Sequence, residues 1–371
     1  MTQTDGPLAG VRVVELASIG PGPFAAMMLA DHGADVVRVD KPGGRAVGSV
    51  RSDRDPMLRG RRVVELDLKD EADVGMALDL CAHADVLLEG FRPGVTERLG
   101  LGPQTVHARN PALVYARMTG WGQDGPLAPR AGHDIDYIAL TGALDATGTR
   151  DSGPVPPMNL VGDFGGGGML MAFGICAALL QARSTGKGCV VDAAMVDGAA
   201  LLMTMMYGLK AQGFWGGGRG NNILDGGAPY YGTYQARDGG WLAVGAIEEP
   251  FWRAFLRIAG LEDEPAMADR LDPRQWPQVR AAIAARLAQR DRAEWMAAFE
   301  GSDACVAPVL SMDEAAHDQH MAARGVLREV GGILQPAPAP RWDGRAPEIA
   351  PTDVRPTGCG EVLARWRRPQ R

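Results

Sequence analysis

Over the first 120 residues, short apolar runs alternate with stretches of helical character. The apolar runs, rich in Val and Leu, are residues 11–16, 34–40, 61–68, 85–90 and 112–120. The helical stretches between them are residues 23–33, 71–84 and 92–100. Strand, helix and strand thus recur at the spacing of a βαβ unit. The pattern predicts an α/β fold whose mostly parallel sheet is covered by helices on both faces.

The character of the chain changes after residue 200. A Met-rich stretch leads into residues 213–227, which are so rich in glycine that we expect a linker. Two strand-like runs then flank Asp238-Gly239-Gly240, a turn sequence that favours an antiparallel hairpin. Three helical stretches follow between residues 249 and 300. These features predict a second, smaller α+β domain.

The expected domain boundaries follow from these changes. They are residues 1–200 for a large Rossmann-like domain, 201–227 for a linker and crossing segment, 228–320 for the small domain, and 321–371 for a return to the large domain. Of the 371 residues, 46% are apolar, which is enough for the cores of two domains.

Charge and cysteine content limit the class of protein. A formal charge of -7 argues against general nucleic-acid binding, which needs a basic face. The five cysteines are scattered, without a C-x-x-C pair, so we expect reduced thiols in a cytoplasmic protein. The longest apolar stretches are interrupted by Gly, Asp or Arg, and the start lacks a signal-peptide pattern, so no membrane association is expected. No cluster has metal-ligand spacing, so no metal site is expected.

Two glycine-containing loops approach nucleotide-binding motifs without matching them. Gly20-Pro-Gly22-Pro follows the first predicted strand, but Ala25 stands at the third glycine position of G-x-G-x-x-G. Residues 184–188 (STGKG) lack the upstream glycine and the following Ser or Thr of a P-loop. We interpret both as tight turns, which disfavours a nicotinamide-dependent dehydrogenase.

Several cations fall near the ends of the predicted strands of the first sheet. They are Arg38, Lys41, Lys69, Arg92 and Arg98. The carboxyl ends of strands are where ligands lie in open α/β sheets, so these side chains could form an anion pocket in an acidic chain. A solvated polar face is the ordinary alternative.

Three residues are candidates for acid–base chemistry. His133 lies beside Asp134 in a glycine-preceded loop, and a lone histidine is usually structural. Asp163 precedes four consecutive glycines at the start of a helical stretch; it could be an N-cap, but capping does not need four glycines, which allow close approach of a ligand. Glu248 follows a predicted strand and would be unremarkable alone.

Taken together, these segments resemble CoA-transferase family III, a group of CoA transferases and α-methylacyl-CoA racemases. The residues that carry the resemblance are GVRVVELASIGPGP, ADVVRVDKP, LLEGFRPGVTERLGLG, YARMTGWGQDGP, GHDIDY, LVGDFGGG, STGKGCVVDAAMVDG and GGAPYYGTY, with VGAIE and PVL further on. The resemblance implies a Rossmann-like large domain that binds acyl-CoA and an interlocked homodimer. The active site would lie between one subunit's large domain and the partner's small domain.

The resemblance also implies which chemistry to expect. The family's transferases use an aspartate, matched by Asp163, as a nucleophile. Its racemases keep that aspartate and add a histidine and a glutamate, matched by His133 and Glu248. The presence of all three favours a racemase that epimerises 2-methylacyl-CoA thioesters, with CoA as part of the substrate and no separate cofactor. A CoA transferase with Asp163 as nucleophile is the alternative, and a non-catalytic acyl-CoA-binding protein is a third.

A racemase mechanism assigns a role to each group. His133 and Asp163 would exchange protons with opposite faces of the α-carbon, and Glu248 would orient the histidine. Backbone N–H groups around Asp163 and Gly165 are expected to hold the enolate oxygen. The residues expected to contact CoA are Arg38, Lys69, Arg92, Arg98, Asp134 and Tyr137. The Met-rich stretch would be either simple core or an adaptable surface for acyl chains.

Overall fold

The computed structural model describes residues 6–43 and 52–367 and divides into two compact units. The first comprises Met1–Thr141, Met158–Leu202 and Ala322–Arg371, and the second comprises Gly142–Pro157 and Met203–Met321. The second unit therefore takes in residues 142–157, which the sequence analysis placed in the large domain.

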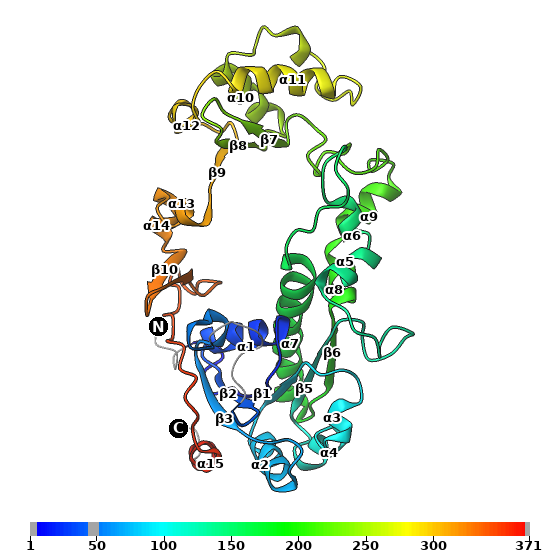
Figure 1. Cartoon of the computed structure of the whole chain (residues 1–371), viewed down its shortest axis with the longest axis vertical. Coiled ribbons are helices and arrows are strands. Elements are labelled where there is room, and N and C mark those ends of the chain that lie inside the picture. The colour runs from blue at the N-terminus through cyan, green and yellow to red at the C-terminus, as the bar shows by residue number, and fades with distance from the viewer. Residues whose placement is uncertain (1–5, 44–51, 368–371) are drawn as a thin grey trace. The chain divides into compact units, whose positions relative to one another are not determined.

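A six-stranded sheet forms the centre of the first unit (Figure 1). Its strands are β1 (Arg12–Leu16), β2 (Asp35–Asp40), β3 (Arg61–Glu65), β4 (Val86–Glu89), β5 (Val114–Thr119) and β6 (Val190–Ala194). Every neighbouring pair is parallel, in the order β3-β2-β1-β4-β5-β6. The order reverses between β1 and β4, as in a doubly wound nucleotide-binding fold. The predicted α/β class and parallel sheet are confirmed.

Helices connect the strands of the first unit. They are α1 (Pro21–Asp31), α2 (Glu71–Ala82), α3 (Val95–Arg98), α4 (Pro103–Arg109), α5 (Asp134–Leu140), the π-helix η4 (Leu160–Met169), α7 (Leu170–Thr185) and α8 (Met195–Leu202), with short 3-10 turns at Ser52–Arg54 and Pro56–Leu58. The sequence analysis missed α4 and treated the start of α5 as loop. Both are short, and periodicity is a weak signal over so few residues.

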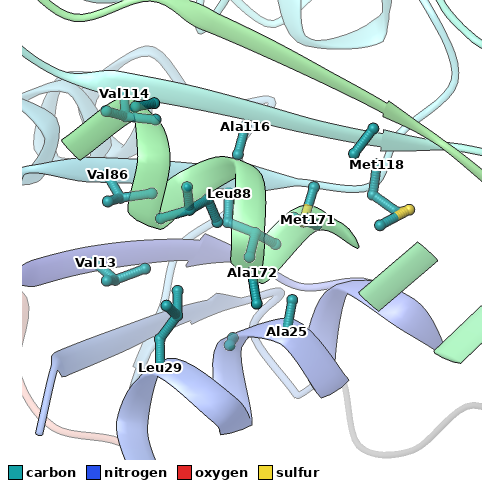
Figure 2. Packing of buried hydrophobic residues seen from close by; sticks show 14 of the residues in the cluster. Val13, Ala25, Leu29, Val86, Leu88, Val114, Ala116, Met118, Met171 and Ala172 are labelled. Carbon is teal, nitrogen blue, oxygen red and sulfur yellow. The ribbon is translucent and has the colours of Figure 1, made fainter. Parts of the chain in front are cut away.

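Apolar side chains pack on both faces of this sheet. On one face, Val13, Val86 and Val114 point toward α1 and α7, where Leu29 and Ala172 meet them (Figure 2). The other face has its own buried cluster, which includes residues of α2, α4 and the C-terminal helix. Because neither face meets water, the strands are continuously hydrophobic, and this is why the sequence pattern showed no alternation.

The C-terminal segment belongs to the first unit. It contains the antiparallel pair β10 (Leu327–Val330) and β11 (Ile333–Pro336), followed by α15 (Cys359–Trp366). The buried Arg59 attaches this segment to the core. Its guanidinium pairs with Asp31 at 2.6 Å and donates to the side-chain oxygen of Gln335 at 2.9 Å.

The second unit is a smaller α+β structure. Its antiparallel strands are β7 (Gly232–Gln235), β8 (Trp241–Val244) and β9 (Val306–Val309), and its helices are α6 (Ala143–Ala146), α9 (Thr204–Ala211), α10 (Glu249–Ala259), η5 (Pro265–Met267), α11 (Trp276–Leu287), α12 (Arg292–Phe299) and α13 (Met312–Ala315), with α14 (Gln319–Arg324) at its boundary with the first unit. The predicted hairpin and the three helical stretches are confirmed. Phe255 and Trp295 are fully buried between them. Residues 201–227, expected to be a linker and crossing segment, contain the end of α8, the helix α9 and a loop organised by Asp225. The Asp225 carboxylate accepts backbone N–H groups from Gly220, Asn222 and Gly227.

One continuous helical segment, Leu160–Thr185, is long and apolar enough to cross a membrane by length and composition. It packs against α1 and β5 in the first unit, and core helices of globular domains pass the same test.

Candidate functional site

A cavity of about 630 Å³ opens in the first unit, at the point where the strand order reverses. The loops after β1, β4 and β5 line it, together with residues 130–133, α5 and η4. Parallel strands leave a crevice at such a reversal because their connections run to opposite faces of the sheet, and ligands bind there in open α/β folds. The sheet topology therefore places this cavity beside two of the predicted acid–base residues, His133 and Asp163.

Asp163 is the fourth residue of the π-helix η4. A π-helix is wide and rare, and it often marks a functional site. The glycines after Asp163 allow this helix to pack closely against its neighbours. A Cβ on Gly166 would lie 2.6 Å from the backbone nitrogen of Ala199 in α8, and one on Gly168 would lie 2.6 Å from the ring of Phe24 in α1. The sequence predicts that these glycines admit a ligand, whereas the structure uses Gly166 and Gly168 for helix packing.

The carboxyl group of Asp163 is half-buried and lines the cavity. Burial raises its pKa, while a hydrogen bond of 3.0 Å from the side-chain amide of Asn159 opposes the rise. The negative charge of Asp134 raises the pKa further, and His133 lowers it; the net result lies above the ordinary value of 3.8. A carboxyl group with a raised pKa can donate a proton as well as accept one, which suits an acid–base role.

His133 stands on the wall of the same cavity. It is the N-cap residue of α5 in extended conformation, and its backbone N–H donates to the carboxylate of Asp136 at 2.9 Å. Its exposed side chain lines the cavity, and its charge acts on Asp163. The structure therefore brings together His133 and Asp163, which are 30 residues apart in the sequence.

Asp134, expected to contact CoA, has a different environment. Only 7% of it is exposed, and its Oδ2 accepts the backbone N–H of Asp163 at 2.7 Å. That N–H group is therefore already bonded to Asp134, whereas the N–H group of Gly165, the other one expected to hold an enolate oxygen, stays a prediction.

Tyr137 forms part of the cavity wall, as expected. Its hydroxyl donates to the carbonyl of Gly132, and its ring meets Trp121 edge-on with centroids 4.8 Å apart. Burial, followed by the negative charge of Asp163 and its neighbours, raises the pKa of Tyr137 to about 12. The phenol therefore stays protonated near neutral pH and serves as a rigid wall.

The four cations that were predicted to bind phosphate have different environments in the structure. Arg92 lines the cavity, in the loop after β4. Lys69 and Arg98 are exposed but are not among the lining residues. Arg38 is buried, paired with Glu15 at 2.6 Å and with Asp40 at 3.1 Å. Its charge is already balanced, so the structure corrects its interpretation as a phosphate ligand.

Glu248 belongs to the second unit, where it is the N-cap residue of α10. Its neighbour Glu249 pairs with Arg253 and Arg270. The Glu248 carboxylate is exposed and makes no hydrogen bond or ion pair to any residue that the structure describes. It is therefore available to a further group.

Among the cavity residues that the sequence did not single out are Asn159, Trp121 and Arg130. Asn159 could have been found, because it precedes Asp163 by four residues and such a pair shares one helix face. Arg130 and Trp121 lie in an irregular loop, where spacing carries no such signal.

Comparisons with known proteins identify the family of this chain. CoA-transferase family III matches residues 8–357. The chain is 44% identical to the mouse protein "Alpha-methylacyl-CoA racemase" over 95% of this chain and 91% of that protein, and 43% identical to the human protein of the same name over 90% and 86%. A crystal structure of a CaiB/BaiF family protein from Brucella suis has a TM-score of 0.80 at 25% identity and covers 97% of this chain and 99% of that one. The chain belongs to CoA-transferase family III.

Proposed function

We propose that this chain is an α-methylacyl-CoA racemase, which inverts the carbon next to a CoA thioester. The observation that carries the proposal is that His133 and Asp163 line one cavity at the switch point of the sheet. A transferase needs Asp163 alone, whereas inversion needs two groups of which one holds a proton and the other does not. The similarity to the mouse and human racemases supports the same choice.

Inversion proceeds by two proton transfers. One group, for example the neutral imidazole of His133, removes the α-proton and leaves an enolate. The protonated carboxyl of Asp163 then donates its proton to the other face of the same carbon. After both transfers His133 is protonated and Asp163 is deprotonated. The reverse reaction begins from this form of the enzyme. The raised pKa of Asp163 helps, because its protonated form is then populated closer to neutral pH.

Glu248 completes the site in this proposal, as the carboxylate that orients His133 and stabilises its cationic form. The family resemblance implies that it comes from a partner subunit. Its lack of a partner within its own unit supports such a role. Exposed apolar side chains on two helices of the first unit also support a homodimer: Phe173 and Leu180 of α7 and Leu201 of α8 are each more than half exposed.

The CoA portion of the substrate carries phosphate groups. Arg92 is the best-placed of the predicted cations, because it lines the cavity and makes no ion pair within the described residues. Lys69 and Arg98 remain proposed contacts for the distal phosphates, since both follow carboxyl ends of strands in the same sheet.

The decisive experiment is to incubate each enantiomer of a 2-methylacyl-CoA with the protein in heavy water and follow the α-position by NMR. A racemase inverts either enantiomer and introduces α-deuterium. A transferase gives no α-deuterium and forms an aspartyl adduct at Asp163 that hydroxylamine traps. An acyl-CoA-binding protein gives neither result.

A further inference from the structure

Asp134 lies between the two proposed acid–base groups. Its backbone follows His133 directly as the first residue of α5, and its side chain bonds to the backbone of Asp163 in η4. Two elements distant in sequence are thereby joined at the catalytic groups that they carry. The bond is short, at 2.7 Å, and is shielded from water, since Asp134 is 7% exposed. A buried charged hydrogen bond of this kind holds its partners firmly.

The second oxygen of the Asp134 carboxylate, Oδ1, does not add a further contact within the described part of the chain. This atom is buried and, among the residues that the structure describes, accepts no hydrogen bond. The bond to Asp163 is thus the contact that fixes the side chain. Gly162 provides the space for it, because a Cβ there would lie 2.5 Å from Oδ2 of Asp134.

From this geometry we infer that Asp134 is a positioning residue: its carboxylate fixes the turn that carries Asp163 relative to His133 and sets the electrostatic environment of Asp163. The inference rests on the proposed function and replaces the expected contact with CoA. The described charged or titratable groups that act on Asp163 are Asp134 and His133, and Asn159 adds a neutral hydrogen bond. Tyr137 also faces Asp163 and Asp134, but it stays neutral. Asp134 is the negative group among them.

Two substitutions of Asp134 separate the effect of its negative charge from the effect of its hydrogen bond to the Asp163 backbone. Asp134→Asn keeps an oxygen that can accept the Asp163 N–H but removes the charge. We expect it to retain most of kcat. With the enantiomer from which Asp163 removes the α-proton, the acid limb of the kcat/KM profile should move to lower pH, because Asp163 loses a neighbouring negative charge. Asp134→Ala loses the bond as well, and displacement of Asp163 should lower kcat by roughly 10²-fold with little change in KM.

Asp73 provides a matched control. It lies in the first turn of α2 and accepts the backbone N–H of Asp67 at 2.7 Å, the same type of bond, but it does not line the cavity. Asp73→Asn and Asp73→Ala should change thermal stability alone and leave the pH profile in place.

The test has a readout that does not depend on catalysis. ¹³C-labelled aspartate allows the carboxyl of Asp163 to be titrated by NMR, with Asp163→Asn identifying its signal. In Asp134→Asn that titration should move to lower pH whether or not the protein is a racemase. An unchanged Asp163 titration, or an Asp134→Ala variant in which KM rises while kcat stays constant, would overturn the inference. Absence of α-deuterium exchange in the wild-type protein would instead refute the proposed function.

Discussion

Two arginines near the carboxyl ends of strands in one sheet have opposite environments. Arg38 is buried beside Glu15, and its side chain is 10% exposed. Arg61 binds the other oxygen of the same carboxylate at 2.6 Å, so one glutamate holds two guanidinium groups. Arg92 is exposed on the cavity wall and makes no ion pair among the residues that the structure describes.

The difference shows that lying near the carboxyl end of a strand does not by itself decide whether an arginine binds a ligand. Arg38 is a residue of β2 itself, so its side chain is packed among neighbouring strands and must find a buried counter-charge. Arg92 lies in the loop beyond β4, where its side chain can meet a ligand. We therefore expect Arg38 to determine stability and Arg92 to determine substrate binding.

The largest effect is expected for Arg38→Ala. Removing one partner leaves Glu15 buried with less compensation, and such a change costs about 3–5 kcal/mol of unfolding free energy. Urea denaturation measures it. A variant as stable as the wild type, with a raised KM, would return Arg38 to the substrate-binding residues.

The pH dependence of this effect sharpens the comparison. Burial would raise the pKa of Glu15, but Arg61 and Arg38 outweigh it and hold the pKa below its ordinary value of 4.5. A depressed carboxyl pKa contributes stability that is present above the unfolded value and is lost as pH falls through the folded one. The stability difference between wild type and Arg38→Ala should therefore shrink as the pH falls below 4.5. A difference that grows in acid would contradict the ion-pair account.

A smaller effect, and of another kind, is expected for Arg92→Ala. Losing one charge-assisted hydrogen bond to phosphate weakens binding by roughly 1.5–3 kcal/mol, so KM should rise and should respond less to salt. Stability should stay within about 0.5 kcal/mol of the wild type, as for most surface changes. Steady-state kinetics at two ionic strengths give the first result and urea denaturation the second. A collapse of kcat at constant KM would show that Arg92 takes part in the chemistry instead.

The smallest effect is expected for Glu248→Gln, which removes the proposed support of the histidine. If it acts through His133, the two substitutions should couple by about 0.5–3 kcal/mol, and the double variant with His133→Ala should lose little beyond the single histidine change. Turnover numbers of the four proteins complete the cycle. Fully additive losses would mean that Glu248 acts independently of His133.

Hydrophobic runs predicted the sheet well because its strands are buried on both faces. The strands now called β1 to β5, together with α1 and α2, follow from that pattern within a few residues. The π-helix around Asp163 could not be predicted, because its four consecutive glycines serve contacts with α1 and α8 that are set by tertiary structure.

The site was predicted in part, and the reason lies in which contacts are local. His133 and Asp163 were found from unusual neighbouring residues and from the family resemblance. The bond from Asp134 to the Asp163 backbone spans 29 residues, and the Glu15–Arg38 pair spans 23. No periodicity within one element reveals such partners, so Asp134 and Arg38 were both assigned to CoA.

The most direct test of the two-base account is to compare His133→Ala and Asp163→Ala with each enantiomer of a 2-methylacyl-CoA in heavy water. Removing either group should slow inversion by roughly 10²–10⁴-fold. Each variant should still exchange the α-proton of one enantiomer with solvent. The enantiomer that undergoes exchange should differ between the two variants. A mild effect of His133→Ala together with complete loss in Asp163→Ala and no α-deuterium in any protein would contradict the account and favour a transferase.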